Sequence, residues 1–222
     1  MNKHRLQKEQ SFFNERYGDD DSRRKGARKY YSVNRRVWNR YVEIIYNYCR
    51  GKKLLEYGCG TGSRSEQWSK VGAFVTGIDI STEGIKKAKA RVSISEYDAG
   101  YFVMNAEDTE FDDSSFDIVV GTGIIHHLDL LKSFQELNRI LKKDGHAVFI
   151  EPLGYNPFIN LYRALTPQMR TEDEHPLKQA DLRLLGQYFK VEFEYYSMFT
   201  LLAVPFRNAF FFNKLCDFLG LV

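Results

Sequence analysis

Residues 53–62, with the sequence KLLEYGCGTG, carry the signal that decides the fold. The first half is a compact apolar run with an acidic residue, Glu56, near its end, and three glycines follow at alternate positions, Gly58, Gly60 and Gly62. Glycine adopts turn dihedrals that other residues avoid, and it lets a ligand approach the backbone closely. The stretch therefore predicts a buried parallel strand that turns sharply into a helix and binds a nucleotide-like ligand.

Strand and helix signals alternate from this stretch onward, and a chain of 222 residues fits one α/β domain. The alternation predicts a Rossmann-like, doubly wound, mostly parallel sheet. We expect strands at residues 53–57, 73–78, 101–104, 116–120, 146–151 and 191–196, and intervening helices at 63–71, 82–92, 128–141 and 178–188. Two helices, at 6–16 and 32–49, are expected ahead of the first strand.

The expected single domain, residues 1–222, has three parts. Residues 1–51 form an N-terminal helical cap, residues 52–151 form the cofactor-binding core, and residues 152–222 contain a substrate-side insertion and an apolar C-terminal segment. In sheets of this kind ligands bind at the carboxyl ends of the strands. The candidate site residues below all fall at such ends.

Composition limits the functional classes. The formal net charge of +3 does not by itself predict binding to nucleic acid or membranes. The three cysteines, an odd number at unrelated spacings, favour neither a disulfide framework nor a zinc site. The chain begins with a charged, polar segment and not with an apolar signal sequence, so we expect a cytoplasmic protein.

The spacing of the glycines distinguishes two kinds of nucleotide ligand. A dinucleotide fingerprint would have its third glycine at Ser63, whereas here the glycines run G-x-G-x-G after Glu56. This arrangement resembles motif I of the class I S-adenosylmethionine-dependent methyltransferases. Asp79 ends the next expected strand, where a carboxylate can accept hydrogen bonds from ribose hydroxyls. That position fits NAD as well as S-adenosylmethionine, while Ser81 is the expected N-cap of the following helix.

Residues 105–117, NAEDTEFDDSSFD, make the resemblance more specific. They are similar to the pattern of the type 11-like branch, which methylates small molecules and lipids. The resemblance implies S-adenosyl-L-methionine as cofactor and S-adenosyl-L-homocysteine as product. Asn105 replaces the usual aspartate, and its amide oxygen can still accept from the adenine amino group, without the charge. The cofactor-binding residues that it implies are Glu56, Gly58, Gly60, Gly62, Asp79, Ile80, Asn105, Ala106, Glu107 and Thr122.

The segment GTGIIHHLDL, residues 121–130, follows the fourth expected strand and resembles the histidine segment of the same branch. Methylating a hydroxyl requires a base to take its proton, and an imidazole titrates at about 6.5. We predict His127 as the catalytic base and His126 as a second catalytic residue. The alternative is that these histidines only pack in the fold.

The predicted acceptor is a small or lipid-like molecule, methylated at a hydroxyl group. The chain lacks the Asn/Asp-Pro-Pro-aromatic motif of enzymes that methylate the amino groups of adenine or cytosine, so a nucleic-acid substrate is disfavoured. An RNA hydroxyl methyltransferase stays an alternative, because the first fifty residues are basic. A module that binds S-adenosylmethionine without transferring methyl groups is another, and a nicotinamide oxidoreductase is disfavoured by Ser63.

Two segments beyond the core have open roles. Glu172, Asp173, Glu174 and His175 could coordinate a divalent ion, but a solvated acidic loop is the preferred interpretation and no metal site is predicted. Residues 197–222 are densely apolar and aromatic, with charge-free runs too short to span a bilayer. We expect a lid, a dimer surface or a peripheral membrane contact. The seventh, antiparallel strand common in the family is not identifiable here.

Overall fold

A computed structural model describes residues 2–18, 34–166, 171, 174–196 and 199–219. Two helices precede the sheet, α1 (Asn2–Gly18) and α3 (Arg35–Cys49). The remaining helical elements are α4 (Ser65–Lys70), α5 (Thr82–Ser93), η2 (Ile125–His127), α6 (Leu130–Ile140), α7 (Pro157–Leu165), α8 (Gln179–Leu185), η4 (Thr200–Phe206) and α9 (Phe212–Leu219). No helix in these described ranges is long and apolar enough to cross a membrane.

The described chain forms one five-stranded parallel sheet in the order β3-β2-β1-β4-β5. Its strands are β1 (Lys53–Tyr57), β2 (Phe74–Asp79), β3 (Ala99–Val103), β4 (Phe116–Thr122) and β5 (Leu141–Ile150). The chain progresses toward one edge from β1 to β3 and then crosses to β4 on the other side of β1. In such sheets this reversal opens a ligand crevice between the carboxyl ends of the two strands where it occurs.

Helices cover both faces of the sheet. This cover is needed because successive apolar side chains of β1 point to opposite faces. Leu54 faces a core that contains Tyr41 of α3 and Trp68 of α4. Leu55 and its neighbour Tyr57 belong to the opposite core, which includes residues of α6 and α8. A strand that is apolar on both faces is the pattern expected for a buried parallel strand. The doubly wound architecture predicted from the sequence is therefore confirmed.

Most predicted elements agree with the structure, and β1 agrees at both ends. The predicted strand at 191–196 is wrong, because this segment is irregular and pairs with no strand of the described chain. Its alternating apolar side chains, Phe193 and Tyr195, are both exposed, so neither face of the segment packs on a core. Glu194 instead forms an ion pair with Arg40 of α3. The predicted helix at 128–141 ends one residue early because β5 begins directly at Leu141.

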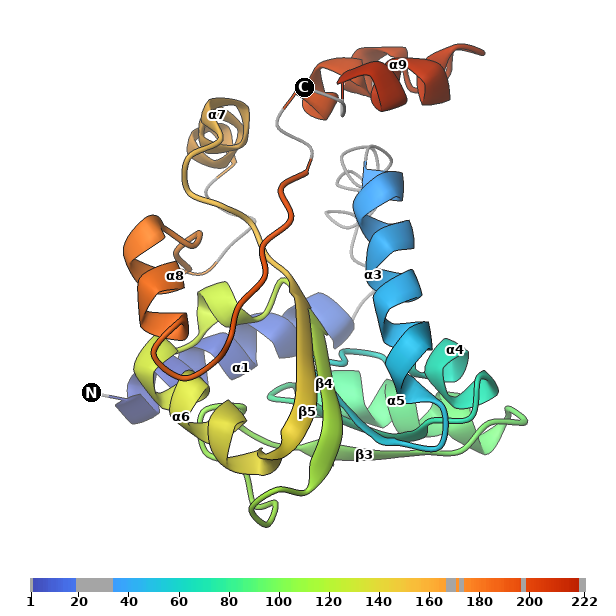
Figure 1. Ribbon diagram of the computed structural model, residues 1–222, viewed down its shortest axis with the longest axis vertical. Helices are drawn as coiled ribbons and strands as arrows, with labels where there is room; N and C mark the ends of the chain where they lie inside the picture. Colours follow the sequence, from blue (N-terminus) through green and yellow to red (C-terminus); the bar gives the residue numbers. More distant parts are fainter. Residues whose placement is uncertain (1, 19–33, 167–170, 172–173, 197–198, 220–222) are drawn as a thin grey trace.

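Helices α7 and α9 lie at the carboxyl end of the sheet (Figure 1). Figure 1 shows α7 and α9 beyond the end of β5, with α3 rising beside them, while α1 lies close to the sheet. Helix α9 packs on η4 around Ala203, Val204 and Cys216. Two side chains of the predicted N-terminal cap, Tyr30 and Tyr31, lie outside the described residues.

Candidate active site

A large crevice opens at the carboxyl ends of the strands and brings together most of the predicted site residues. It is lined by Gly58, Gly60, Asp79, Ile80, Asn105, Ala106, Thr122, His126 and His127. The other three predicted cofactor residues, Glu56, Gly62 and Glu107, are buried beneath this lining and do not contribute to it. The crevice thus contains the four loops that follow β1, β2, β3 and β4.

The turn after β1 requires its glycines. Gly58, Gly60 and Gly62 have φ angles of 63°, 54° and 65°, which L side chains adopt only with strain. The amide of Cys59 donates to the carbonyl of Ile78 at 2.9 Å, which fixes the turn against β2. A Cβ atom on Gly60 would lie 2.7 Å from the hydroxyl oxygen of Tyr17. The Tyr17 ring therefore occupies the space that the missing side chain of Gly60 leaves at the turn.

Asp79 connects this turn to the start of α5. Its carboxylate accepts hydrogen bonds from the amides of Gly60 and Ser81, both at 2.8 Å. Burial raises the pKa of Asp79, and the two amides partly oppose this effect. Ser81 caps α5 by accepting from the amide of Gly84, as predicted. Asp79 keeps unused lone pairs toward the crevice, because each carboxylate oxygen can accept two hydrogen bonds.

Glu56 supports the turn from below. Its carboxylate accepts a hydrogen bond of 2.6 Å from the hydroxyl of Ser65, the first residue of α4. Burial raises the pKa of Glu56 to about 7, although Ser65 and Arg64 oppose the shift. The acidic residue of the turn motif thus ties β1 to α4.

The loop after β3 contains the predicted adenine-binding residues. The amide oxygen of Asn105 accepts from the amide of Glu107 at 3.1 Å, so one of its lone pairs is used within the loop. The Glu107 carboxylate accepts from the amide of Asp129 at 2.9 Å and forms an ion pair with Arg5. Glu107 therefore joins three segments and does not face the crevice.

The histidine pair occupies the short helix η2 after β4. His126 Nδ1 lies 2.7 Å from Glu151 Oε2, while the other oxygen of Glu151 accepts from the amides of Ile124 and Ile125 at 2.9 Å. This carboxylate fixes the His126 ring and the backbone of η2 together. The two imidazole rings are buried, with centroids 4.2 Å apart. Glu151, which the sequence locates at the crevice, is thus the partner of His126.

His127 faces a carboxylate from the N-terminal helix. Its Nδ1 atom lies 3.7 Å from Glu9 Oε2, and Phe13 meets its ring edge to face at a centroid distance of 5.4 Å. Desolvation raises the pKa of Glu9, but the nearby His127, a hydrogen bond from Thr171 and the charge of Arg5 produce a net lowering. The Thr171 hydroxyl donates to the other oxygen of Glu9 at 2.6 Å. Glu9 is therefore a charged partner for His127.

Sequence reasoning missed much of the contribution of α1. Gln10 donates to the carbonyl of Ile80 at 2.9 Å, and Asn14 accepts from the hydroxyl of Ser81 at 2.8 Å. Tyr17, near the end of the same helix, covers Gly60 and Gly84. The apolar periodicity of α1 is weak, and only the polar residues on one helix face could have indicated these contacts.

Arg64 is a second residue that the motifs did not indicate. Its guanidinium lies 4.8 Å from the ring centroid of Trp38 and donates to the hydroxyl of Thr122. Arg64 lines the crevice between the glycine turn and the end of β4. A fixed cation at this position suits a carboxylate group on a ligand.

Comparisons with known proteins agree with this geometry. Residues 55–149 match the type 11 family model described as a methyltransferase domain. The ubiquinone/menaquinone biosynthesis C-methyltransferase UbiE of Geotalea uraniireducens is 30% identical over 136 residues, covering 59% of this chain and 57% of the relative. The ubiquinone biosynthesis O-methyltransferase of Haemophilus ducreyi is 33% identical over 111 residues, covering 47% of each chain.

A solved structure shows the same relationship. Phosphoethanolamine N-methyltransferase 2 of Haemonchus contortus, in complex with phosphomonomethylethanolamine and S-adenosylhomocysteine, superposes with a TM-score of 0.57 and is 25% identical, covering 68% of this chain and 36% of the other. Residues 55–149 therefore have the methyltransferase domain of the type 11 branch of the class I S-adenosylmethionine-dependent methyltransferases. The chain spans about half the length of the curated relatives that it matches.

Proposed function

We propose that this protein transfers a methyl group from S-adenosylmethionine to a hydroxyl group of a small or lipid-like acceptor, with S-adenosylhomocysteine as the second product. The observation that carries the proposal is the histidine pair, which lies in the same crevice as the glycine turn and Asp79. Each histidine has a carboxylate partner, Glu151 or Glu9. Such a pair is suited to taking a proton from an acceptor.

The crevice residues fit the cofactor in three places. The glycine turn would accept the close approach of the nucleoside once the Tyr17 ring moves away from Gly60, and Asp79 can accept from its ribose hydroxyls. Asn105 and Ala106 offer polar groups of the third loop to the adenine ring. Arg64 offers its guanidinium to the carboxylate of the methionine part. Ile80, Glu56, Gly62 and Glu107 would act by shaping or supporting these groups.

When it is bound, S-adenosylmethionine supplies the methyl group: the acceptor oxygen forms the new carbon–oxygen bond, the sulfur–carbon bond breaks, and the hydroxyl proton leaves to a base. His127 is our proposed base, because the Glu9 carboxylate can stabilise its imidazolium form. His126, fixed by Glu151, positions the acceptor beside it. Alignment should supply most of the acceleration, since positioning two reactants recovers about 7–11 kcal/mol of a barrier.

The acceptor class rests on the relatives and on the surface around the crevice. The named relatives act in quinone biosynthesis, where substrates are small and lipid-like. Exposed apolar side chains flank the crevice in α7 and the loop before it, among them Tyr155, Leu161 and Leu165. These side chains would contact an apolar acceptor more favourably than a polar one.

An RNA hydroxyl methyltransferase is the second candidate, but the basic face of α3 gives it little support. Arg35 pairs with Asp217 at 3.0 Å and Arg40 pairs with Glu194 at 2.9 Å. Arginines held by carboxylates are less available to phosphates. A binding module without transfer activity would need no proton acceptor, whereas both histidines are present in the crevice.

We also propose a peripheral membrane or dimer contact through the C-terminal segment, and a cytoplasmic location. Phe206, Phe210 and Phe218 are exposed on η4, α9 and the turn between them, next to Arg207 and Lys214. Exposed aromatic and basic side chains on one segment are typical of contact with a lipid surface.

The test of the proposed function uses S-adenosylmethionine labelled in its methyl group, incubated with purified protein and a fractionated extract of the source cells. Label in the organic or the small-molecule aqueous phase would support the proposal. Label confined to precipitated RNA would show that the acceptor is RNA and not a small or lipid-like molecule. Cofactor binding without any transfer would favour the binding module.

His127→Gln should keep cofactor binding and slow transfer by about 10²- to 10⁴-fold, and unchanged turnover would contradict the assignment of His127 as the base.

A further inference from the structure

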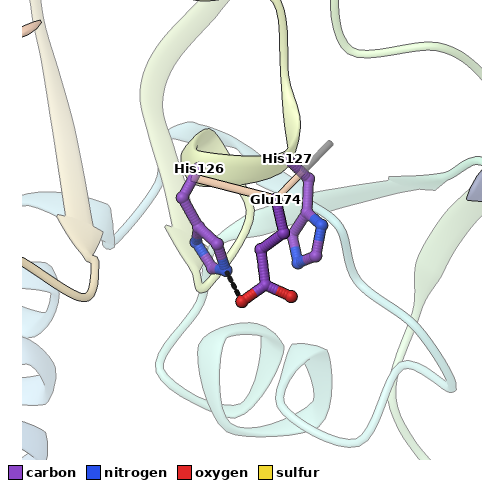
Figure 2. Close-up of side chains that lie close together, drawn as sticks. All are labelled: His126, His127 and Glu174. Atoms are coloured by element: carbon purple, nitrogen blue, oxygen red, sulfur yellow. Dashed lines mark ion pairs between the residues drawn. The ribbon is translucent and has the colours of Figure 1, made fainter. Parts of the chain in front are cut away.

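Three side chains that line the crevice form a cluster, and its third member, Glu174, has no part in the proposed methyl transfer. His126, His127 and Glu174 each offer one ligand atom, and these atoms all lie within 4.8 Å of one another. Figure 2 shows the rings of His126 and His127 on either side of the Glu174 carboxylate. The amide of His175 donates to the carbonyl of His126 at 3.0 Å, which attaches the segment carrying Glu174 to η2.

His126 is oriented in the manner of a metal ligand. Its Nδ1 atom faces Glu151 at 2.7 Å, so its Nε2 atom points to Glu174, 3.7 Å away. Metal-binding histidines usually direct their second nitrogen at a carboxylate, which fixes the ring and strengthens the ligand. Glu151 has this role for His126, and its own backbone hydrogen bonds hold it in place.

His127 repeats the arrangement less tightly. Its Nδ1 atom faces Glu9 at 3.7 Å and has no hydrogen bond, although the side chain is more than nine-tenths buried. A buried imidazole nitrogen without a hydrogen bond destabilises the folded protein. A cation bound at the other ring nitrogen would polarise the Nδ1–H group and strengthen its attraction to Glu9.

The charges around the pair also favour a cation. In the described part of the chain, three carboxylates lie within 4 Å of the two rings, those of Glu9, Glu151 and Glu174. Arg163 pairs with Glu174 at 2.6 Å and offsets one of these charges. Arg5, which pairs with Glu107, also acts on Glu9, so the carboxylates that face the rings are offset only in part.

We propose that His126, His127 and Glu174 bind one divalent transition-metal ion, for which Zn²⁺ is the best match. Two histidines and one glutamate are a known catalytic zinc ligand set that leaves a fourth position open, and imidazole ligands select against Mg²⁺. A tetrahedral zinc ion with bonds of about 2.1 Å separates its ligand atoms by about 3.4 Å. The side chains would therefore close on the ion by about an ångström from their present separations of up to 4.8 Å.

The consequence for catalysis rests on the proposed function. An acceptor hydroxyl at the open position would give up its proton to water at a lower pH, because the ion stabilises the resulting oxyanion. In the zinc-loaded protein His127 would then act as a ligand, and the metal would replace it in activating the acceptor.

The experiment is a zinc titration of protein dialysed against a chelator, with calorimetry for affinity and elemental analysis for stoichiometry. We expect one Zn²⁺ per chain and much weaker binding of Mg²⁺. Glu174→Gln and His126→Asn should lower the affinity for Zn²⁺ by more than about 100-fold, and Glu151→Gln by about 10- to 100-fold. His146→Gln, at an exposed position of β5, is the matched control and should bind as the unmodified protein does.

Thermal unfolding shows whether each variant is folded. If one variant is unfolded, the absorption of bound Co²⁺ in the other proteins reports metal coordination. No bound zinc in the unmodified protein, or equal affinity in Glu174→Gln, would overturn the proposal. Binding of S-adenosylmethionine and transfer of label are measured on the same samples. Zinc binding without transfer would contradict the proposed function alone, and transfer by zinc-free protein without zinc affinity would contradict this inference alone.

Discussion

The guanidinium group of Arg5 forms an ion pair with the carboxylate of Glu107, although 102 positions separate the two residues. The same guanidinium donates to the carbonyl of His127 at 2.8 Å. One side chain of α1 therefore connects the loop after β3, which contains the predicted adenine-binding residues, with the histidine pair after β4.

Arg5→Gln should reduce stability and cofactor affinity together. The substitution leaves the buried Glu107 carboxylate without its cation, which costs about 1–3 kcal/mol. Urea unfolding and calorimetry with S-adenosylhomocysteine measure the two effects. Lys3→Gln, on an exposed part of the same helix, is the control. An unchanged unfolding midpoint in Arg5→Gln would show that the ion pair does not hold α1.

Asp79→Asn should weaken the binding of S-adenosylmethionine while the protein stays folded. The amide keeps the shape of the side chain but removes the charge that two backbone amides share, and that we propose for the ribose hydroxyls. Hydrogen bonds to charged groups contribute about 1.5–3 kcal/mol, so the loss should be about 10- to 100-fold in Kd. Calorimetry measures this loss of affinity. The control is Asp98→Asn, which changes an exposed aspartate ahead of β3. Equal affinity in both variants would exclude Asp79 from the cofactor site.

Stability should fall as the pH rises through the range in which Glu56 titrates. Burial raises the pKa of Glu56 from its ordinary value of 4.5 to about 7, so the folded state binds a proton that the unfolded state has lost. The stabilising contribution is complete below about pH 4.5 and is lost as the pH approaches and passes 7. This contribution of Glu56 to the free energy of unfolding is at most about 3 kcal/mol.

Glu56→Gln tests this pH dependence, because the amide resembles the protonated acid and still accepts from Ser65. Urea midpoints between pH 5 and pH 8, about the interval of the titration, should depend less on pH in the variant than in the unmodified protein. Glu110→Gln, an exposed position, should keep the original slope. Parallel slopes for Glu56→Gln and the unmodified protein would contradict the assignment.

The C-terminal aromatic residues give a separate prediction about membranes. Phe210 is fully exposed and Phe218 is 67% exposed. Burying one phenylalanine in lipid contributes about 1.5–3 kcal/mol, so replacing either with serine should lower vesicle partitioning about 10- to 100-fold. Sedimentation with vesicles of mixed anionic and neutral phospholipid measures the change. Leu131→Ser, exposed on α6, is the control, and concentration-dependent dimerisation without vesicle binding would favour a dimer surface.

The sequence predicted the parts of the site that follow directly from a strand. The glycine turn, Asp79 and the histidine pair each occupy a strand's carboxyl end, and a parallel sheet brings such ends to one edge. Both bounds of β1 were predicted correctly, because the strand begins at the exposed Lys53 and ends before Gly58, whose positive φ starts the turn.

The side chains that complete the site were less predictable. Glu9 comes from α1, and Glu174 from a segment that the sequence suggested was a solvated acidic loop. Both reach the histidines only through tertiary packing, which no local pattern records. The strand predicted at residues 191–196 is wrong for the same reason. The alternating pattern is typical of a strand, but a strand also needs a neighbouring strand with which to pair. Glu172 and Asp173 lie outside the described residues.

The contacts of α1 with Ile80, Ser81 and the glycine turn have a consequence for the order of events in a catalytic cycle. Because Tyr17 of this helix covers Gly60, α1 must release the glycine turn before a nucleoside can bind there or leave. We expect the methyl donor to enter first and the demethylated nucleoside to depart last. Turnover would then be limited by how often α1 releases its hold, and accumulated product would inhibit competitively against the donor.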